Sequence, residues 1–431
     1  MRFSSNVSKK DYILFYKNHD RTFMQSYEWG EFNKEVRNQN PHYVGLYDDN
    51  GKLVAVSLLL EKKLFFGYSY FYAPRGFLLD YNNLEILTEF SKYLYEYIKK
   101  NKGIFLRHDP EIKYQTIDIE GNVIKEGDNN YELFNNLLKL GYKHNGFTKE
   151  FESTQPRYTF RIDLEQDLDQ IKSNINKSII KKINKTYEYD MLFRETSDTD
   201  TFYNLIQNNS IKDNFNSYSK DYYKTEYEIL GTKDIIKVFE LVINPNDLYK
   251  KTIKKLEELI SSNSNNKNQN IERQNKIKNI LEPFKKDREL VICSQICALT
   301  SKGMWSLYIG NNNIGTELYA VNRMYYEMIN YGKEHKCSFL DFFGTIGSTN
   351  IKHKSLIGIH NYKKNYGGEY TEFIGEFDLV NKKILYFIFI KLIPIYRNIR
   401  KKLIKIGRRN NENWWDIKQG IWKICEYSST V

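Results

Sequence analysis

The chain of 431 residues is poor in cysteine and proline, and it lacks any long apolar run. Its 4 cysteines show no Cys-x-x-Cys pair and no metal-ligand spacing, so neither a zinc site nor a disulfide framework is expected, and this usage is typical of a reducing compartment. The first ten residues, MRFSSNVSKK, have no apolar core of the kind that a secretory signal requires. Because no stretch of about 18 uncharged apolar residues occurs, we expect no transmembrane helix.

Acidic residues are absent from residues 381–410, which carry ten lysines and arginines out of a chain whose formal net charge is +11. The basic character therefore belongs mostly to this one segment. Its apolar positions face away from the basic ones and comprise Ile395, Tyr396, Ile399, Leu403 and Ile406. This pattern is typical of a helix that lies in a membrane interface. We expect 381–431 to be a basic amphipathic tail that binds an anionic membrane surface; a helix packed on the body with solvated lysines is the alternative.

The body of the chain has the composition of a folded protein, with 41% hydrophobic and 15% aromatic residues, and its length suits two domains with additions. Asn50-Gly51 between two apolar runs predicts a hairpin. Residues 85–100 have helical spacing, and residues 103–110 have the pattern of a strand. Pro110 restricts Asp109 to an extended conformation, so we expect its carboxylate at a strand end.

Residues 170–187 predict a basic amphipathic helix. Isoleucines recur every four residues, at Ile171, Ile175, Ile179 and Ile183, and the segment holds five lysines and no acid. Such a helix suits phosphate groups, and a solvated outer face is the alternative.

Residues 247–290 predict an insertion in the second half of the chain. Two narrow apolar stripes flank the polar run SSNSNNKNQN at 261–270, and residues 249–290 have a net charge of +5. An antiparallel helical hairpin is the natural solution for stripes of this kind.

Residues 339–377 contain the most informative stretch. An aromatic run brackets a single acid, Asp341, and stops at Gly344, which predicts a buried strand that delivers Asp341 to a loop. Tyr362-Lys363, Gly367-Gly368 and a strand-like FIGEFD follow. On the residues alone, an ordinary strand–loop–strand with solvated lysines is the alternative.

Three ordered motifs in this stretch resemble the late motif of the Fem-type peptidoglycan aminoacyltransferases, the FemABX family. They read LDFFG at 340–344, YKKNYGG at 362–368 and GEFD at 375–378. Earlier segments are similar as well: QSYEW followed by Lys34, APRGFLLD at 73–80, RHDP at 107–110 and QPRYTFRIDL at 155–164. The chain departs from the family at Phe77, where proline is usual, and at Lys212, where arginine is usual. The resemblance covers roughly residues 20–380.

The resemblance implies an α/β fold class with two tandem N-acetyltransferase-like (GNAT-like) domains. The first would span 1–151, completed by a strand at 370–380, and the second would comprise 152–246 and 291–369. The helical hairpin at 247–290 would be an arm similar to that of seryl-tRNA synthetase, and contact with tRNA and a merely structural insertion are equal alternatives. The basic tail would follow at 381–431.

The resemblance also implies a tRNA-dependent aminoacyltransferase that needs no cofactor. It would move Gly, Ala or Ser from aminoacyl-tRNA to the stem-peptide amine of a peptidoglycan precursor, either lipid II or UDP-MurNAc-pentapeptide. It would act in the cytoplasm, peripherally at the inner face of the bacterial membrane, alone or with a sibling Fem-type protein or a second copy. A catalytically inactive membrane-surface scaffold is one alternative. An acyl-CoA-dependent N-acyltransferase is another, although Asn311–Thr316 lacks the expected glycine-rich pyrophosphate loop.

Two residues are candidates for catalysis by this resemblance. Lys363 would stabilise the oxyanion or the tRNA 3′ end, and Asp109 would orient or deprotonate the acceptor amine. Lys34 and Lys212 would hold precursor phosphates. The other candidate substrate-binding residues are Arg75, Asp80, Tyr308, Asp341, Tyr362 and Glu376. Plain structural roles are the alternatives, among them a surface lysine at 34, pairing of Arg75 with Asp80, and a buried sheet tyrosine at 308. No metal site is expected.

Overall fold

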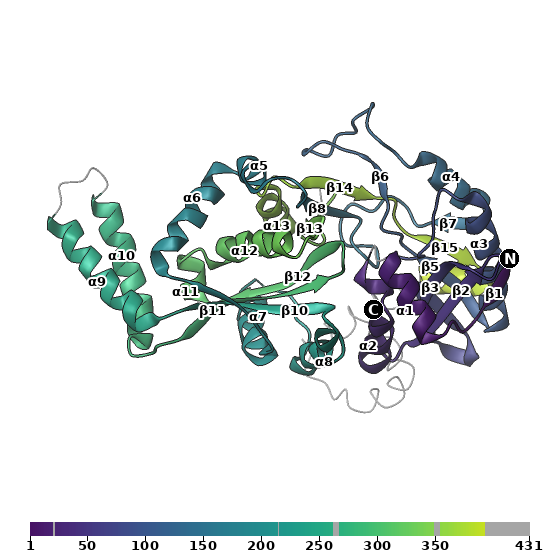
Figure 1. The fold of residues 1–431 in the computed structure, drawn as a ribbon, viewed down its shortest axis with the longest axis horizontal. Coiled ribbons are helices and arrows are strands. Elements are labelled where there is room, and N and C mark those ends of the chain that lie inside the picture. The colour runs from purple at the N-terminus through teal and green to yellow at the C-terminus, as the bar shows by residue number, and fades with distance from the viewer. Residues whose placement is uncertain (20–21, 214, 262–266, 349–353, 393–431) are drawn as a thin grey trace, which may run out of the picture. The chain divides into compact units, whose positions relative to one another are not determined.

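The computed structural model describes residues 1–19, 22–213, 215–261, 267–348 and 354–392. The chain divides into two compact units. Among the described residues, unit 1 comprises Met1–Thr116, Val123–Arg157 and the chain from Glu372 to residue 392, and unit 2 comprises Ile117–Asn122 and Tyr158–Thr371. Each unit combines a mixed sheet with helices, which confirms the predicted α/β class (Figure 1).

The sheet of unit 1 has the strand order β1-β2-β3-β4-β5-β15-β7. Its strands are β1 (Arg2–Ser4), β2 (Asn40–Tyr47), β3 (Leu53–Lys63), β4 (Ser69–Ala73), β5 (Gly103–His108), β7 (Tyr142–His144) and β15 (Phe377–Val380). β4 and β5 are parallel, whereas the other neighbours are antiparallel. The predicted hairpin joins β2 to β3, and Gly51 takes a positive φ of 77° in its turn. The late strand β15 lies between β5 and β7, so the end of the described chain returns to unit 1.

Helices cover the sheet of unit 1. They are α1 (Lys9–Asn18), α2 (Tyr27–Arg37), α3 (Leu84–Lys100), α4 (Tyr131–Lys139) and α14 (Lys383–Phe387), with short helical turns η1 (Phe23–Gln25), η2 (Phe65–Gly67) and η6 (Ile388–Leu392), and with β6 (Lys113–Thr116) as a further strand. The predicted amphipathic helix at 85–100 is α3, whose Leu87, Phe90, Leu94 and Ile98 are buried against the sheet. The spacing of three and four places these side chains on one face.

The second sheet has eight strands in the order β6-β14-β8-β13-β12-β11-β10-β9, and the strands from β14 to β9 form the sheet of unit 2. Its strands are β8 (Tyr158–Asp163), β9 (Leu192–Thr196), β10 (Ile236–Ile243), β11 (Leu290–Leu299), β12 (Gly303–Asn311), β13 (Phe339–Asp341) and β14 (Glu369–Phe373). β12 and β13 are parallel, and β13 runs antiparallel to β8 with Asp341 opposite Arg161. This register decides which side chains meet at the end of β13.

The helices of unit 2 surround a large apolar core. They are α5 (Leu168–Asn174), α6 (Lys177–Thr186), α7 (Thr199–Asp213), α8 (Lys220–Leu230), α11 (Asn313–Glu317), α12 (Ala320–Glu334) and α13 (Ser355–Lys364), with turns η3 (Tyr187–Tyr189) and η4 (Gly231–Lys233). The prediction of one continuous helix over 170–187 is wrong, because the helix is interrupted at Ile175 and Asn176, between α5 and α6. The Asn176 side chain caps α6 by accepting from the Ser178 N–H at 2.8 Å, and the Asn176 N–H donates to the Asn365 carbonyl at 2.9 Å. The four isoleucines are nevertheless all buried.

The predicted helical hairpin is present within unit 2. It consists of α9 (Pro245–Ser261) and α10 (Lys267–Leu281), followed by the turn η5 (Glu282–Phe284), and the two helices pack side by side (Figure 1). Leu256, Ile277 and Leu281 are buried along their seam. The apolar stripes read from the sequence therefore face one another.

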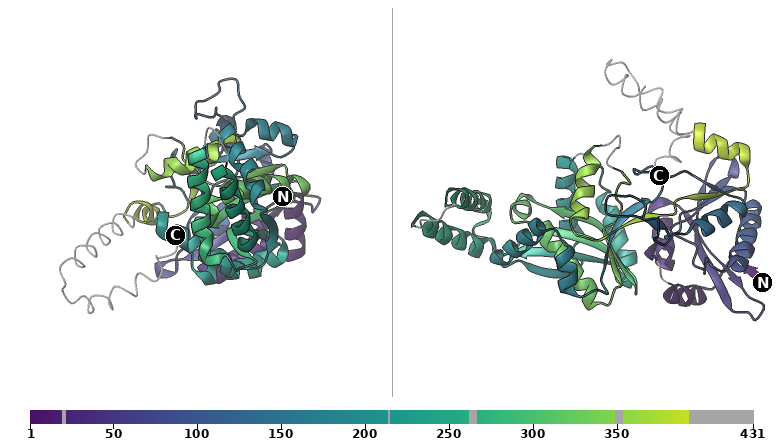
Figure 2. Two further views of the ribbon diagram at one scale, coloured as in Figure 1. Left: turned by 90° about the vertical axis from the view of Figure 1, so that its left-hand side faces the viewer. Right: turned by 90° about the horizontal axis from the view of Figure 1, so that it is seen from above.

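Of the predicted basic tail, residues 383–392 form α14 and η6, and residues 393–431 lie outside the described part of the chain. Figure 2 shows α14 and η6 in yellow against unit 1. Among the helices of the described residues, none has the length and apolarity needed to cross a bilayer.

Candidate functional site

In unit 1, Asp109 lies directly after β5, at the strand end that Pro110 predicts. Its side chain is 2% exposed. The Tyr72 hydroxyl donates to Oδ2 at 2.9 Å, and the Arg75 backbone N–H donates to Oδ1 at 2.8 Å. Both donors belong to the end of β4 and the turn after it. The neighbouring parallel strand therefore holds the Asp109 carboxyl in one orientation.

Burial raises the pKa of Asp109 to about 7, because a desolvated carboxylate is less stable than the neutral acid. The positive charge of Arg75 opposes this shift, while the nearby Glu376 carboxylate adds to it. A carboxyl with a pKa near 7 exchanges its proton readily at neutral pH, as a general base must. Of the sequence-predicted acids, Asp109 thus has the chemistry that fits a proton acceptor.

Arg75 and Asp80 do not form the pair that the sequence left as an alternative. Arg75 has a φ of 50° in the turn after β4, donates from Nη2 to the Pro156 carbonyl at 2.8 Å, and places its guanidinium 4.7 Å from the centre of the Phe373 ring. Asp80 is exposed, and its Oδ1 accepts from the Asn82 N–H at 3.0 Å. Arg75 therefore stays beside Asp109, whereas Asp80 orders a surface turn.

Glu376 lies just before β15 and is 6% exposed. It accepts a hydrogen bond from the Thr154 backbone N–H, and its Oε2 lies 3.5 Å from Nη1 of Arg107. Arg107 also makes two 2.9 Å hydrogen bonds to Asp378, which is fully buried. These contacts hold the segment that carries Glu376 close to the end of β5, where its charge acts on Asp109.

In unit 2, Asp341 ends β13 and is 2% exposed. It accepts hydrogen bonds from the Thr159 hydroxyl at 2.5 Å, from Arg161 Nε at 2.7 Å and from the Phe343 backbone N–H at 2.6 Å. The antiparallel register of β8 with β13 supplies the first two donors. Asp341 thus anchors the turn that follows its own strand.

Lys363 holds the same turn from helix α13. Its Nζ donates to the Phe343 carbonyl at 2.7 Å and to the Gly344 carbonyl at 2.6 Å, and Phe343 itself has a φ of 57°. Burial lowers the pKa of Lys363 to about 8, although the negative charge of Asp341 opposes the shift. A lysine ammonium has three N–H donors, and two of them are assigned to these carbonyls. The third can bind a developing negative charge.

Tyr362 precedes Lys363 on α13, and its hydroxyl lies 2.9 Å from that of Tyr366 and accepts from Asn322 Nδ2 at 3.1 Å. Burial raises its pKa. Because Asn322 belongs to α12, these bonds join α12 to α13 and set the position from which Lys363 extends. Asp341, Tyr362 and Lys363 are therefore brought together in unit 2.

The remaining predicted residues are Tyr308, Lys34 and Lys212. Tyr308 is within β12, and its ring packs 5.4 Å from that of Tyr223 and 6.0 Å from that of Tyr218. Lys34 is exposed near the end of α2 in unit 1, and Lys212 is exposed near the end of α7 in unit 2. The structure does not join these three to either constellation.

Three positioning residues escaped the sequence analysis: Tyr72, Thr159 and Arg161. A signal for the last two is present, because polar Arg157, Thr159 and Arg161 alternate with apolar residues along 157–162. Alternation places these polar side chains on the face opposite the apolar core. Tyr72 has no comparable signal, since it lies within the aromatic run SYFYA.

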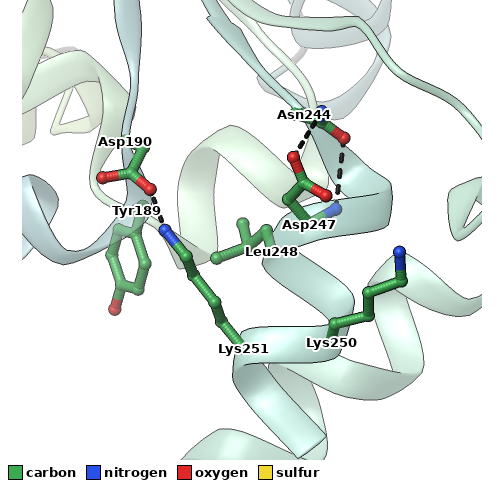
Figure 3. Close-up of a pocket in the computed structure, with 7 residues that line it drawn as sticks. All are labelled: Tyr189, Asp190, Asn244, Asp247, Leu248, Lys250 and Lys251. Atoms are coloured by element: carbon green, nitrogen blue, oxygen red, sulfur yellow. Dashed lines mark hydrogen bonds and ion pairs between the residues drawn. The ribbon is translucent and has the colours of Figure 1, made fainter.

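A pocket of about 310 Å³ opens at the base of the arm, between η3 and the start of α9 (Figure 3). Four of its polar residues bind one another in pairs: Lys251 pairs with Asp190, and Asn244 Nδ2 donates to Asp247 at 2.8 Å. Its described lining includes none of the sequence-predicted site residues. We therefore assign it no part in the site.

The loop at 311–316 is organised by its own side chains. The Asn312 side chain caps the five-residue helix α11 and accepts from the Gly315 N–H at 2.8 Å. A Cβ on Gly315 would lie 2.3 Å from the Ile292 carbonyl oxygen, so this glycine serves close packing. These contacts occupy the helix start where an acyl-CoA enzyme would bind pyrophosphate.

Comparison with known proteins decides the family, because a model of the FemAB family matches residues 7–392. The chain belongs to the FemAB family. It is 25% identical over 430 residues to Aminoacyltransferase FemA of Staphylococcus epidermidis. The aligned region covers 93% of this chain and 99% of that relative. The chain is 24% identical over 427 residues to Lipid II:glycine glycyltransferase of the same species, covering 94% and 98%. The predicted enzyme class, aminoacyltransferase, is thereby confirmed.

A solved structure of FemX confirms the fold of this FemAB-family chain. It superimposes with a TM-score of 0.74 at 22% sequence identity and covers 90% of this chain and 99% of that one. The predicted fold class of tandem α/β units is confirmed by this likeness, which extends over both units.

Proposed function

We propose that this chain transfers glycine from glycyl-tRNA to the stem-peptide amine of a peptidoglycan precursor, and that the precursor is lipid II. The names of the relatives support glycine and lipid II, since one of them is a lipid II:glycine glycyltransferase. Within the chain, the observation that carries the proposal is Asp109. It is a buried carboxyl at a strand end with a pKa of about 7.

The reaction is the attack of an amine on an activated ester. The amine nitrogen forms a bond to the ester carbonyl carbon, a tetrahedral oxyanion develops, and the C–O bond to the tRNA ribose breaks. The attacking nitrogen must lose a proton, and the ribose oxygen must gain one. Asp109 accepts the proton from the amine when ionised, and its position between Tyr72 and the Arg75 N–H orients it for that task.

Lys363 supplies the positive charge for the oxyanion or for the phosphate at the tRNA 3′ end. With a pKa of about 8 it is mostly charged at neutral pH. Its bonds to the Phe343 and Gly344 carbonyls hold the ammonium in place before substrate arrives, which is the condition under which a charge lowers a barrier most. Asp341 and Tyr362 position Lys363 rather than touch the reacting atoms.

Lys34 and Lys212 would bind precursor phosphates, because each is an exposed ammonium. A lysine binds phosphate as a point charge and needs no bidentate geometry. A lipid-linked acceptor and a tRNA donor meet at the inner face of the cell membrane. We propose that the enzyme works there, bound peripherally.

The two alternatives from the sequence have less support. An acyl-CoA-dependent transferase would need the start of α11 for pyrophosphate, and Asn312 occupies it. A scaffold without catalysis would have no use for a buried carboxyl in unit 1 with a pKa raised to about 7, or for a lysine in unit 2 with a pKa lowered to about 8, because such shifts cluster at functional sites.

Transfer of radiolabelled amino acid from a charged tRNA pool to lipid II tests the proposal. We expect label in lipid II that is lost after ribonuclease treatment of the pool. Separately charged glycyl-, alanyl- and seryl-tRNA then identify the donor, and the proposal requires glycine to be preferred. Label that persists after ribonuclease treatment would rule out a tRNA donor.

A further inference from the structure

Two distant segments of unit 1 meet beside β5: the turn between β3 and β4, and the helix that begins the basic tail. Ile104 and Phe105 of β5 form the centre of a separate apolar cluster. Residues on both sides of the turn, Leu64 and Tyr68, pack against this cluster, and so do tail residues, Leu385, Phe389 and Ile390. The Tyr70 and Phe389 rings lie 5.2 Å apart. The turn and α14 therefore lie side by side.

Large apolar side chains extend from both segments into solvent. Phe66, at the tip of the turn, is 89% exposed, and Ile384 and Phe387 on α14 are 79% and 57% exposed. Ile384 and Phe387 share one face of the helix because they are three residues apart. Single exposed apolar residues are ordinary, but three on two segments that pack against the same cluster call for an explanation. We call these three residues the Phe66 surface.

The backbone at Phe66 gives a second, independent observation. Phe66 has a φ of 56° and a ψ of 27°, in the left-handed region that asparagine and glycine adopt readily and that bulky residues adopt rarely. A bulky residue kept in this backbone conformation points to a function at the tip of the turn.

The charges around the Phe66 surface are positive. Lys382, Lys383 and Lys391 are exposed, and residues 381–392 contain no acid. Lys143 Nζ lies 5.0 Å from the centre of the Tyr386 ring on α14. The acid of the neighbouring strand, Glu61, is 3% exposed and is bound by Lys63 at 2.6 Å. Exposed aromatic and aliphatic side chains among lysines match an anionic bilayer interface.

We propose that the Phe66 surface inserts into the headgroup region of an anionic membrane and holds unit 1 against it. The proposal rests on the proposed function, because a lipid-linked acceptor keeps its reactive amine close to the bilayer. It adds a contact that the basic tail alone does not supply. In this proposal the turn between β3 and β4 contacts lipid. Both strands belong to the sheet that also contains β5, the strand that Asp109 follows.

The test is binding of the full chain to vesicles of phosphatidylcholine with and without phosphatidylglycerol, measured by co-sedimentation. Phe66→Asn is the decisive variant, since asparagine suits the left-handed backbone and folding should be preserved. Leu14→Asn, which removes a 59% exposed residue from α1, is the matched control. We expect Phe66→Asn to weaken partitioning onto anionic vesicles by roughly tenfold, as burial of one aromatic side chain implies. Leu14→Asn should bind like the wild type.

Several results would overturn the proposal. The proposal is wrong if the wild-type chain does not bind anionic vesicles. It is also wrong if the Phe66→Asn and Ile384→Asn variants bind these vesicles as tightly as the wild type. A Phe66→Asn change that abolishes self-association but leaves vesicle binding intact would show that the surface serves a second copy instead.

The same variants separate this inference from the proposed function. Vesicle binding needs neither tRNA nor acceptor, so it can be measured even if no transfer is found. Phe66→Asn should retain transfer to the water-soluble UDP-MurNAc-pentapeptide and lose transfer to lipid II in vesicles. If wild-type chain binds through Phe66 but transfers to no acceptor, only the proposed function fails. If transfer occurs and vesicle binding is the same for the wild type and for Phe66→Asn, only this inference fails.

Discussion

Replacement of Asp109 by asparagine should make the protein more stable at neutral pH while it removes catalysis. The unfolded chain ionises this carboxyl at its ordinary pKa of 3.8, but burial raises the folded-state pKa to about 7. Between these values the unfolded state has already lost the proton that the folded state retains. The free energy of unfolding therefore falls as pH rises from 3.8 to 7, because ionisation costs more in the folded state.

The magnitude follows from the two pKa values. One pKa unit corresponds to about 1.4 kcal/mol, so the full penalty is about 4 kcal/mol, and about 2 to 3 kcal/mol of it develops between pH 5 and pH 7.5. Asparagine keeps an acceptor oxygen for the Arg75 N–H and a polar group for Tyr72 but never ionises. The stability gain of Asp109→Asn over wild type should thus grow by about 2 to 3 kcal/mol across this interval.

Urea titrations at pH 5 and pH 7.5, followed by circular dichroism, measure this difference. Asp80→Asn, which removes the exposed carboxylate of the following turn, provides the baseline for loss of a carboxylate. In parallel, transfer by Asp109→Asn should fall by about 10² to 10⁴-fold, the usual contribution of a general base. A variant that is destabilised at pH 7.5, or whose stability difference is the same at both pH values, would refute a desolvated carboxyl at this position.

The other predictions concern the reaction and unit 2. The pH profile of transfer should be bell-shaped, rising as Asp109 ionises near pH 7 and falling as Lys363 loses its proton near pH 8, and Lys363→Arg should remove the alkaline limb. Lys363→Met should lower kcat by about 10² to 10³-fold with a smaller change in KM, and a folded variant with full transfer would contradict the role of Lys363. Asp341→Leu should lower the free energy of unfolding by about 3 to 5 kcal/mol, because it leaves Arg161 without its 2.7 Å partner, and a urea titration showing no loss would contradict this. Lys34→Ala should raise KM for the precursor and leave kcat unchanged, whereas an effect on kcat alone would contradict phosphate binding.

Local rules account for much of what the sequence predicted correctly. Pro110 placed Asp109 at a strand end, and the structure has it directly after β5. Apolar stripes on either side of a polar run predicted the hairpin of α9 and α10. Both inferences depend only on residues close together in the chain, and the tertiary contacts of the fold agree with them.

What the sequence missed depends on contacts between distant segments. The break at Ile175 is stabilised by the bond from Asn176 to Asn365, a residue far along the chain. The Arg161 partner of Asp341 follows from the register of β8 against β13, which periodicity alone does not supply. The pKa of Lys363 is lowered by its burial in the folded protein, and the sequence motif carries no information about burial. The resemblance could therefore suggest this residue but not its pKa.

The most direct test of the central claim is the mass of the product. The full chain is incubated with glycyl-tRNA and lipid II, and the lipid II stem peptide is then analysed by mass spectrometry with fragmentation. The account predicts the mass increase of glycine on a stem-peptide amine, in wild-type chain and not in Asp109→Asn. Unmodified stem peptide, in a reaction where the chain binds both glycyl-tRNA and lipid II, would contradict it.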